Sequence, residues 1–564
     1  MEFRTPANMK LQGWGHPQIT FPMEDRPELW PFVRRKLGME RDLFCAPVPL
    51  ESIRLPASLL SRAQVDELGE LVSPERVSTD ERERLAHTFG KSFPDLWRAR
   101  QGLIERAPDA VVWPRSHEDV IALVAWAKSA AAHIIPFGGG TNIVNALEVK
   151  AEASGPVLSL DLRAMNRVLA LNPTANLALI EAGATGPVLE EQLAERGFSL
   201  GHFPDSFEFS TLGGWIATRS AGMQSDGYGR IEDMVEALHV VSSEVNLELK
   251  PFPASSAGPD LNRTFIGSEG CFGVITRAWM RVHAVPEKKS YVGYLFRSFA
   301  QGLQAVKACH DSDIRPTLVR LQDEGETELA LHLKSPRPLG KLLVELPVKK
   351  LIHQLGYTRP AVMVVGFEGA ASEVQHRAQT AAKIFRREGG FPLGDSIGST
   401  WSKDKYNTPY LRDYVMDYGG IADVAETATH WSELASLHQA VLTSVDDAAR
   451  AEGVSAYVGC HLSHTYRTGG CLYFTWAMMG GEAALERYYR VKKRVTSAIV
   501  RAGGTLSHHH AVGTEHLPWL AGELGEGGAR LLMATKHMLD PQQIFNPGGL
   551  MVKRRHPVMG EAHD

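Results

Sequence analysis

The feature that most restricts the fold of this chain is a run of three glycines in the segment PFGGGTN, residues 136–142, which ends a mostly apolar stretch. Successive residues without a Cβ can adopt positive φ angles and bring backbone N–H groups against a bound anion. Thr141 and Asn142 add side-chain donors. The segment therefore predicts a phosphate-binding loop or, alternatively, a plain glycine-rich turn. Its spacing is not GxGxxG, so it does not match the fingerprint of nicotinamide-binding domains.

Two further segments rich in glycine and small polar residues follow the first. One spans residues 201–235 and contains PDSFEFSTLGGW, and the other is GSEGCFGVIT at residues 267–276. Small residues between hydroxyl and carboxylate side chains suit a long polar ligand that is held by backbone contacts along its length. FAD is such a ligand, and the three segments together favour a site for it.

The length of the chain indicates more than one domain. At 564 residues it exceeds what a single core usually holds, about 250–300 residues. From residue 108 to about residue 285, short β-like runs alternate with amphipathic helices, which is typical of α/β or α+β domains. Longer strand-like and helical segments follow. The expected strands are 111–113, 134–136, 157–162 and 177–181, and the expected helices are 61–71, 79–85, 118–132, 186–196 and 528–538.

A run of three histidines, SHHHAVG at residues 507–513, is the second candidate for chemistry. In extended backbone, side chains alternate, so we expect His508 and His510 on one face and His509 on the other. Imidazole titrates near neutrality and suits proton transfer. The alternatives are a polar surface run and a metal pair. Because no nearby cysteine or acidic residue completes a usual ligand set, we expect no metal.

Two residues of the second half add candidates for anion binding and proton transfer. Arg412 lies in the helix-like segment TPYLRDYVMDYG, and its guanidinium can bind a phosphate or carboxylate with two hydrogen bonds. Tyr473 lies in a strand-like run and offers a phenol. A surface salt bridge for Arg412 and a core position for Tyr473 are the alternatives.

Charge, cysteines and hydropathy restrict the partners and the compartment. The formal charge of −5 and the lack of a basic run argue against non-specific nucleic-acid binding. Five scattered cysteines without CxxC spacing predict no disulfide framework and favour a reducing compartment. No stretch approaches the roughly 20 apolar residues of a membrane-spanning helix. We recognise no secretory or peroxisomal signal and expect a cytoplasmic or peripheral membrane protein.

The ordered trio of glycine-rich segments resembles the FAD-binding domain of the vanillyl-alcohol-oxidase-type flavoproteins. The resemblance implies that the first segment contacts the diphosphate and that the other two line the path to the isoalloxazine. The first segment contains neither histidine nor cysteine, so we expect non-covalent FAD. The matching positions are Pro136, Phe137, Gly138, Gly139, Gly140, Thr141, Asn142, Asp205, Ser206, Ser210, Thr211, Gly214, Thr218, Arg219, Ser220, Ala221, Glu269, Gly270, Gly273, Val274 and Ile275.

Within that superfamily the chain resembles the alkyldihydroxyacetonephosphate synthases, from KLQGWG near Lys10 to DPQQIFNPG near the end, with GHFPDSFEFSTLGGW and YLRDY as the most specific matches. The resemblance implies a redox-neutral exchange of the acyl group of acyl-dihydroxyacetone phosphate for a long-chain fatty alcohol. It implies substrate binding by Arg412. It places Tyr473, His202 and the triplet His508, His509 and His510 among the catalytic residues.

The same resemblance implies an α+β fold with four parts and a homodimer, and peripheral membrane contact would deliver the lipid substrates. The expected parts are a helical N-terminal extension (1–105), a two-subdomain FAD-binding domain (106–285), a substrate-binding cap (286–507), and a histidine segment that packs back on the FAD domain (508–564). The chain departs from the family at Thr514 and Glu515, where HHHGVGK would place a lysine, so a shifted substrate is expected there. The alternative function is an FAD-dependent oxidase or dehydrogenase of a 2-hydroxy acid or alcohol.

Overall fold

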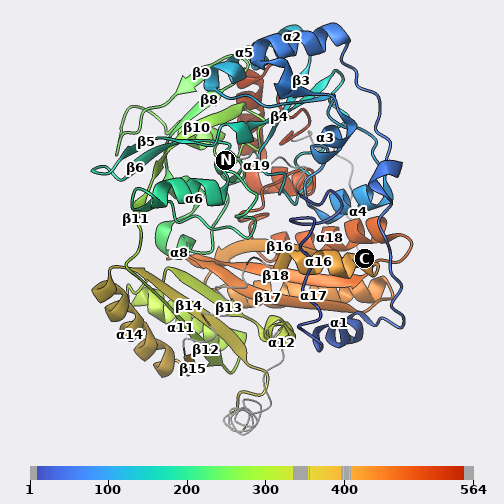
Figure 1. The fold of residues 1–564 in the computed structure, drawn as a ribbon. Helices are drawn as coiled ribbons and strands as arrows, with labels where there is room; N and C mark the ends of the chain where they lie inside the picture. The colour runs from blue at the N-terminus through green and yellow to red at the C-terminus, as the bar shows by residue number, and fades with distance from the viewer. Residues whose placement is uncertain are drawn as a thin grey trace.

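The computed structural model describes residues 9–333, 354, 356–394, 398, 406 and 408–551. It is an α+β protein in which two smaller sheets lie above one large antiparallel sheet in the view of Figure 1. Two hydrophobic cores reflect this division, one around the smaller sheets and one around the large sheet. Among the described residues, no helix is both long enough and apolar enough to cross a bilayer.

The first half contains a four-stranded sheet in the order β1-β2-β4-β3, a five-stranded sheet in the order β5-β6-β10-β8-β9, and a two-stranded sheet of β7 and β11. The pairs β2–β4 and β3–β4 are parallel, so the carboxyl end of β3 delivers the glycine run to the sheet edge. The strands are β1 (Val77–Ser78), β2 (Ala110–Val112), β3 (His133–Phe137), β4 (Val157–Asp161), β5 (Val168–Asn172), β6 (Leu177–Glu181), β7 (Phe198–Ser199), β8 (Val235–Val241), β9 (Asn246–Glu248), β10 (Val274–Arg281) and β11 (His283–Ala284). The helices of this region are α5 (His117–Ser129), α6 (Gly186–Ala194), α7 (Leu212–Thr218), α8 (Ser225–Tyr228), α9 (Ile231–Met234) and α10 (Asn262–Phe265).

The second half is a seven-stranded sheet in the order β15-β12-β14-β13-β17-β18-β16. Its strands are β12 (Lys288–Phe296), β13 (Leu318–Gln322), β14 (Ala361–Gly369), β15 (Phe391–Gly394), β16 (Gly420–His430), β17 (Ala456–Thr465) and β18 (Gly469–Met479). The helices are α11 (Phe299–Asp311), α12 (Glu324–His332), α14 (Ala371–Arg387), α16 (Thr408–Asp417), α17 (Leu434–Ala451) and α18 (Ala484–Arg501). Side chains alternate along β18: Phe474 and Trp476 enter the helix-covered core, whereas Tyr473 and Thr475 face the opposite side.

The two ends of the chain connect the halves. The N-terminal region holds α1 (Leu29–Leu37), α2 (Arg62–Val72), α3 (Glu81–Ala86) and α4 (Phe93–Gln101). α1 packs on the large sheet, where Phe32 and Tyr457 contact each other. The last long helix, α19 (Leu517–Leu539), lies beside the upper sheets in Figure 1. The region around α1 therefore packs on the large sheet, and the C-terminal helix lies with the upper sheets.

The local predictions agree with these elements to within a few residues; α19 has a kink at Gly525, and the predicted helix 528–538 corresponds to the part after that kink. The strand 177–181 has the predicted ends, and the helix near residues 61–71 begins after Ser61, whose side chain accepts from the Gln64 N–H in a capping box. The five cysteines form no disulfide. The domain boundaries stay a prediction.

The predicted extended backbone of the histidine run is wrong. Residues 508–510 form consecutive bends between α18 and α19. The rings do not alternate: Nδ1 of His508 lies 2.8 Å from Nδ1 of His509, and the His509 and His510 ring centres are 4.4 Å apart. The carboxylate of Glu426, on the large sheet, accepts hydrogen bonds from the backbone of this bend.

Candidate active site

A cavity of about 890 Å³ lies between the upper sheets and the large sheet. One side is lined by the glycine run at residues 136–142 and by parts of the other two glycine-rich segments. The opposite side carries Tyr473, His509, His510 and Arg412. The structure thus brings together residues more than 330 positions apart in the sequence.

The glycine run is packed backbone against backbone. A Cβ on Gly139 would lie 2.0 Å from the carbonyl oxygen of Phe209, and one on Gly138 would lie 2.3 Å from Oγ1 of Thr211. Thr211 also caps α7 by accepting the N–H of Gly214. Only residues without a side chain allow this approach, and it leaves a Cβ-free wall on the cavity. Such a wall, with Thr141, Ser206 and Ser210 beside it, fits the diphosphate of FAD.

Nineteen of the 21 predicted FAD-contacting residues line the cavity, and Arg219 and Val274 do not. Arg219 ends α7 with φ 54°, and its side chain forms an ion pair with Glu232 at 3.0 Å. Val274 is fully buried in the core at the start of β10. Both were included because they belong to continuous motifs, whereas alternate residues of a strand point to opposite faces.

His509, His510 and Tyr473 form one wall of the cavity. The ring of Tyr473 lies 6.0 Å from the His509 ring and 5.5 Å from the His510 ring, centre to centre. Burial lowers the pKa of each of these two imidazoles to about 3 and raises the pKa of Tyr473 well above its ordinary value. At neutral pH the wall therefore presents two neutral imidazoles and a protonated phenol.

The other two predicted catalytic histidines lie outside the cavity lining. His508 is buried behind His509, stacks on His464, and shares a hydrogen bond with the Tyr466 hydroxyl. His202 is 1% exposed and packs on Trp215, and its Nε2 lies 3.1 Å from Oγ of Ser220. Since Ser220 lines the cavity, His202 supports the wall from behind.

Arg412 lies in α16 and reaches the cavity. Its Nη1 donates to the carbonyl oxygen of Lys91 at 2.6 Å, whereas Nε and Nη2 are buried and donate to no acceptor within the described part of the chain. A buried guanidinium with two unsatisfied donors is costly unless an anion completes it. The side chain therefore fits a binding site for a phosphate or carboxylate.

Several cavity residues were not predicted. Glu326 on α12 accepts from Arg320 at 2.7 Å and contacts Nδ1 of His461 at 2.7 Å, and all three line the cavity beside Tyr473. His461 lies opposite Tyr473 in the pairing of β17 with β18, and their rings stack at 4.9 Å. The alternation of His461 and Ser463 along β17 was a usable signal, because both face the same side.

The N-terminal extension, to which the sequence assigned no chemistry, also lines the cavity. The lining from α1, the residues before it and α12 is mostly apolar and includes Phe21, Phe32, Val33, Leu37, Leu329 and Leu333. An apolar arm thus adjoins the polar part of the cavity. Part of this arm comes from α1, which belongs to the N-terminal extension.

The departures at Thr514 and Glu515 have a structural role. The Thr514 N–H donates to the carbonyl oxygen of Val144. Glu515 pairs with Lys492 at 2.8 Å and accepts from the Tyr488 hydroxyl at 2.6 Å, and Asp423 holds the same lysine at 2.7 Å. Lys492 therefore presents no unpaired positive charge to the cavity, because two carboxylates form ion pairs with it.

Comparisons with known proteins agree with this site. The model of an FAD binding domain matches residues 108–245, and that of the C-terminal domain of FAD linked oxidases matches residues 285–550. The chain is 38% identical to the alkyldihydroxyacetonephosphate synthase of Trypanosoma brucei brucei over 88% of this chain and 82% of the relative. It is 39% identical to that of Dictyostelium discoideum over 86% and 80%.

A solved structure of an alkyldihydroxyacetonephosphate synthase superposes with a TM-score of 0.85 at 34% identity and covers 96% of this chain and 99% of its own. The matched domain models and the Cβ-free wall agree that FAD is the cofactor. Both relatives and the solved structure match over most of their length, so the likeness includes both halves and the site between them. The chain therefore belongs to the alkyldihydroxyacetonephosphate synthase family of FAD-dependent enzymes.

Proposed function

We propose that this protein exchanges the acyl group of acyl-dihydroxyacetone phosphate for a long-chain fatty alcohol and so forms the ether bond of an ether lipid. The observation that carries the proposal is the composition of one cavity: a wall for FAD, a proton-handling wall, a cation with unsatisfied donors and an apolar arm. A 2-hydroxy acid dehydrogenase needs the first three features and has no use for the apolar arm. The substrates of the proposed exchange use all four.

The exchange balances without an external electron acceptor. The bond between the glycerone carbon and the acyl oxygen breaks, a bond between that carbon and the alcohol oxygen forms, and the alcohol proton accompanies the released acid. When bound, without a covalent bond to the chain, FAD supplies a reactive flavin nitrogen at the glycerone carbon. The protein supplies binding and proton transfer.

The residues take distinct roles in this proposal. Arg412 binds the substrate phosphate through Nε and Nη2. At neutral pH the imidazoles of His509 and His510 are unprotonated, so they can take a proton from the substrate carbon and return it to that carbon when the product forms. The Tyr473 hydroxyl protonates the leaving carboxylate and regains its proton from the alcohol. His202 and His508 hold this wall from behind. The apolar arm takes the acyl chain and then the alkyl chain. A homodimer, peripheral membrane contact and a cytoplasmic location stay predictions from the sequence.

The first experiment supplies purified, FAD-loaded protein with palmitoyl-dihydroxyacetone phosphate and labelled hexadecanol. The expected result is labelled alkyl-dihydroxyacetone phosphate and an equal amount of free palmitate, with no reduction of an added redox dye. Product and acid are measured by mass spectrometry. Steady dye reduction by a 2-hydroxy acid, with no ether product, would establish the dehydrogenase instead.

The role of Arg412 is tested by Arg412→Met, which keeps an unbranched chain and removes the charge. Loss of a buried cation that binds an anion is expected to lower kcat/KM for the acylated substrate by about 100-fold or more, mostly through KM. Flavin content should stay normal. Arg386→Met, at an exposed position of α14, is the control and should leave both parameters unchanged. An unchanged KM in the Arg412 variant would move the phosphate site elsewhere in the cavity.

A further inference from the structure

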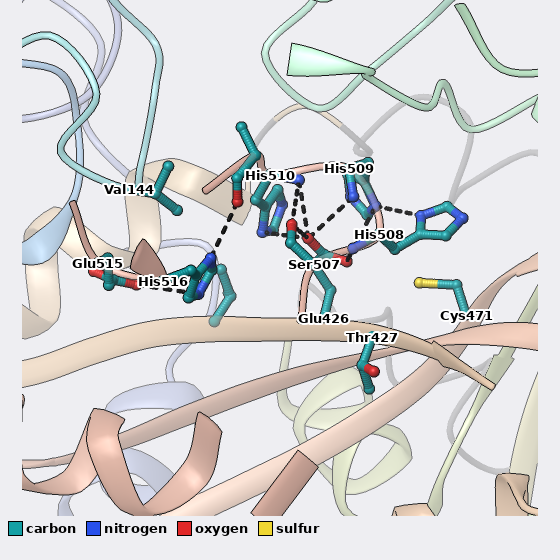
Figure 2. A network of polar contacts seen from close by, with 12 residues as sticks. Val144, Glu426, Thr427, Cys471, Ser507, His508, His509, His510, Glu515 and His516 are labelled. Atoms are coloured by element: carbon teal, nitrogen blue, oxygen red, sulfur yellow. Dashed lines mark hydrogen bonds and ion pairs between the residues drawn. The ribbon is translucent and has the colours of Figure 1, made fainter. Parts of the chain in front are cut away.

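Glu426, on β16, gathers four hydrogen-bond donors from the histidine segment. The N–H groups of His508, His509 and His510 all donate to its carboxylate, the last two at 3.1 and 2.9 Å. The hydroxyl of Ser507 donates to the same carboxylate at 2.7 Å. Figure 2 shows the segment folded around this single side chain.

Three consecutive N–H groups converge on one anion only where the backbone bends. In an extended chain successive N–H groups point in opposite directions, so the alternation predicted for the run cannot coexist with these bonds. Glu426 is 3% exposed, and hydrogen bonds from backbone N–H groups to a buried carboxylate are stronger than neutral ones. Glu426 therefore determines the bend of residues 508–510.

The same carboxylate lies beside the reactive groups. Glu426 is the direct partner of Tyr473 in the pairing of β16 with β18. Its oxygens lie 3.7 Å from Nδ1 of His509 and 3.5 Å from Nδ1 of His510. Arg230 holds the other side of the segment by donating to the His508 carbonyl oxygen at 2.6 Å. One glutamate thus sets the position of both cavity imidazoles relative to the tyrosine.

A metal ion is the alternative occupant of this place. Ligand atoms of Glu426, Cys471, His508 and His509 lie within 4.8 Å of one another. However, four protein donors already occupy the carboxylate oxygens, and Nε2 of His508 is engaged by Tyr466. Three of these donors lie on Oε1 and one, the His508 N–H, lies on Oε2, so a cation bound to the carboxylate would compete with them. The observed bonds therefore favour a structural role for the carboxylate.

We infer that Glu426 is a positioning residue of the active site, which acts through the backbone of residues 508–510 to hold His509 and His510 against Tyr473. It does not line the cavity and so need not touch substrate. The kinetic part of this inference rests on the proposed function. The structural part can be measured on the resting protein.

The test compares Glu426→Gln with Glu190→Gln in the FAD-loaded protein. Glu190 is a half-buried glutamate with a similar set of donors, because it accepts hydrogen bonds from the N–H groups of Leu200 and Gly201 and from the hydroxyl of Ser199, and it lies outside the cavity lining. In Glu426→Gln, an amide N–H₂ faces backbone donors. Hydrogen exchange of the peptide covering residues 505–513 is expected to accelerate about tenfold or more.

The kinetic readout separates positioning from folding. Displacement of the imidazoles by a fraction of an ångström is expected to lower kcat of Glu426→Gln by about 100-fold, with KM and flavin content unchanged. Glu190→Gln is expected to keep kcat and the exchange rate of this peptide. Ser507→Ala, which removes one of the four donors, should give a smaller loss of kcat in the same direction and serves if Glu426→Gln does not fold.

Two outcomes overturn the inference. Unchanged exchange of residues 505–513 in Glu426→Gln would show that the carboxylate does not hold the segment. Faster exchange with wild-type kcat would show that its hold has no bearing on catalysis. Absence of ether product from the unmutated protein would contradict the proposed function alone, because the exchange measurement does not depend on turnover.

Discussion

Replacing His509 or His510 with alanine is expected to lower kcat about a thousandfold while FAD stays bound, since positioned acid–base groups contribute about 10²–10⁴-fold. Each substitution removes a neutral imidazole from the wall that Tyr473 completes. Neither ring belongs to the glycine-rich wall, so flavin binding does not depend on them. Turnover is measured by ether formation, and flavin content by the absorbance ratio of the purified protein.

The pH dependence adds a second measurement. Burial lowers the pKa of both imidazoles to about 3, so in the resting enzyme they are unprotonated at every pH above about 4. Activity that needs a neutral imidazole is therefore kept at alkaline pH and is lost only on strong acidification. No loss of activity from titration of these two groups is therefore expected between pH 5 and pH 8.

The control for both variants is His376→Ala, at an exposed position of α14 outside the cavity lining. It removes an imidazole without touching the cavity and should keep full activity. Wild-type turnover in both His509→Ala and His510→Ala would reduce the triplet to a structural element. Loss of flavin in either variant would place that histidine in cofactor binding instead.

Much of the upper half was predictable because its signals are local. The strand 177–181 and the helix after Ser61 depend on alternation and on a capping box, both of which are contained in a few neighbouring residues. The glycine run was predictable for the same reason, because the absence of a side chain at Gly139 can be read from the sequence itself. The atom that a Cβ at this position would contact, the carbonyl oxygen of Phe209, belongs to a residue 70 positions away.

The wrong prediction for the histidine run and the site residues that were not predicted depend on contacts between residues far apart in the sequence. The histidine run has the alternation of a strand only if nothing else binds its N–H groups, and Glu426, 82 positions earlier, binds three of them. Arg320, Glu326 and His461 lie on three different elements, so no single motif contains them. α1 looks like an ordinary amphipathic helix, and only its packing reveals that Phe32 lines the cavity. Only His461 leaves a local signal, through its alternation with Ser463 along β17; which residues it meets across the cavity is not visible in any local pattern.

Gly139→Ala is expected to give protein that has lost most of its FAD. The added Cβ would lie 2.0 Å from the Phe209 carbonyl oxygen and 2.8 Å from Cα of Ser210, both backbone atoms that cannot rotate away. The two glycine-rich segments must then move apart. Overpacking of this kind costs about 1–3 kcal/mol. Because both segments line the FAD wall, the affinity for FAD bears this cost, and flavin content is expected to fall to roughly a tenth.

The measurement is the flavin absorbance of the purified variant, followed by titration with added FAD. Gly522→Ala, in α19, is the matched control: its Cβ meets nothing within 4 Å, and alanine favours a helix over glycine. It should retain full flavin and equal or greater thermal stability. A Gly139 variant with wild-type flavin content would show that the wall tolerates a Cβ, and the diphosphate would then have to lie elsewhere along the cavity. If excess FAD restores both the flavin content and ether formation, the defect lies in the affinity for FAD alone. The geometry of the reacting groups is then intact.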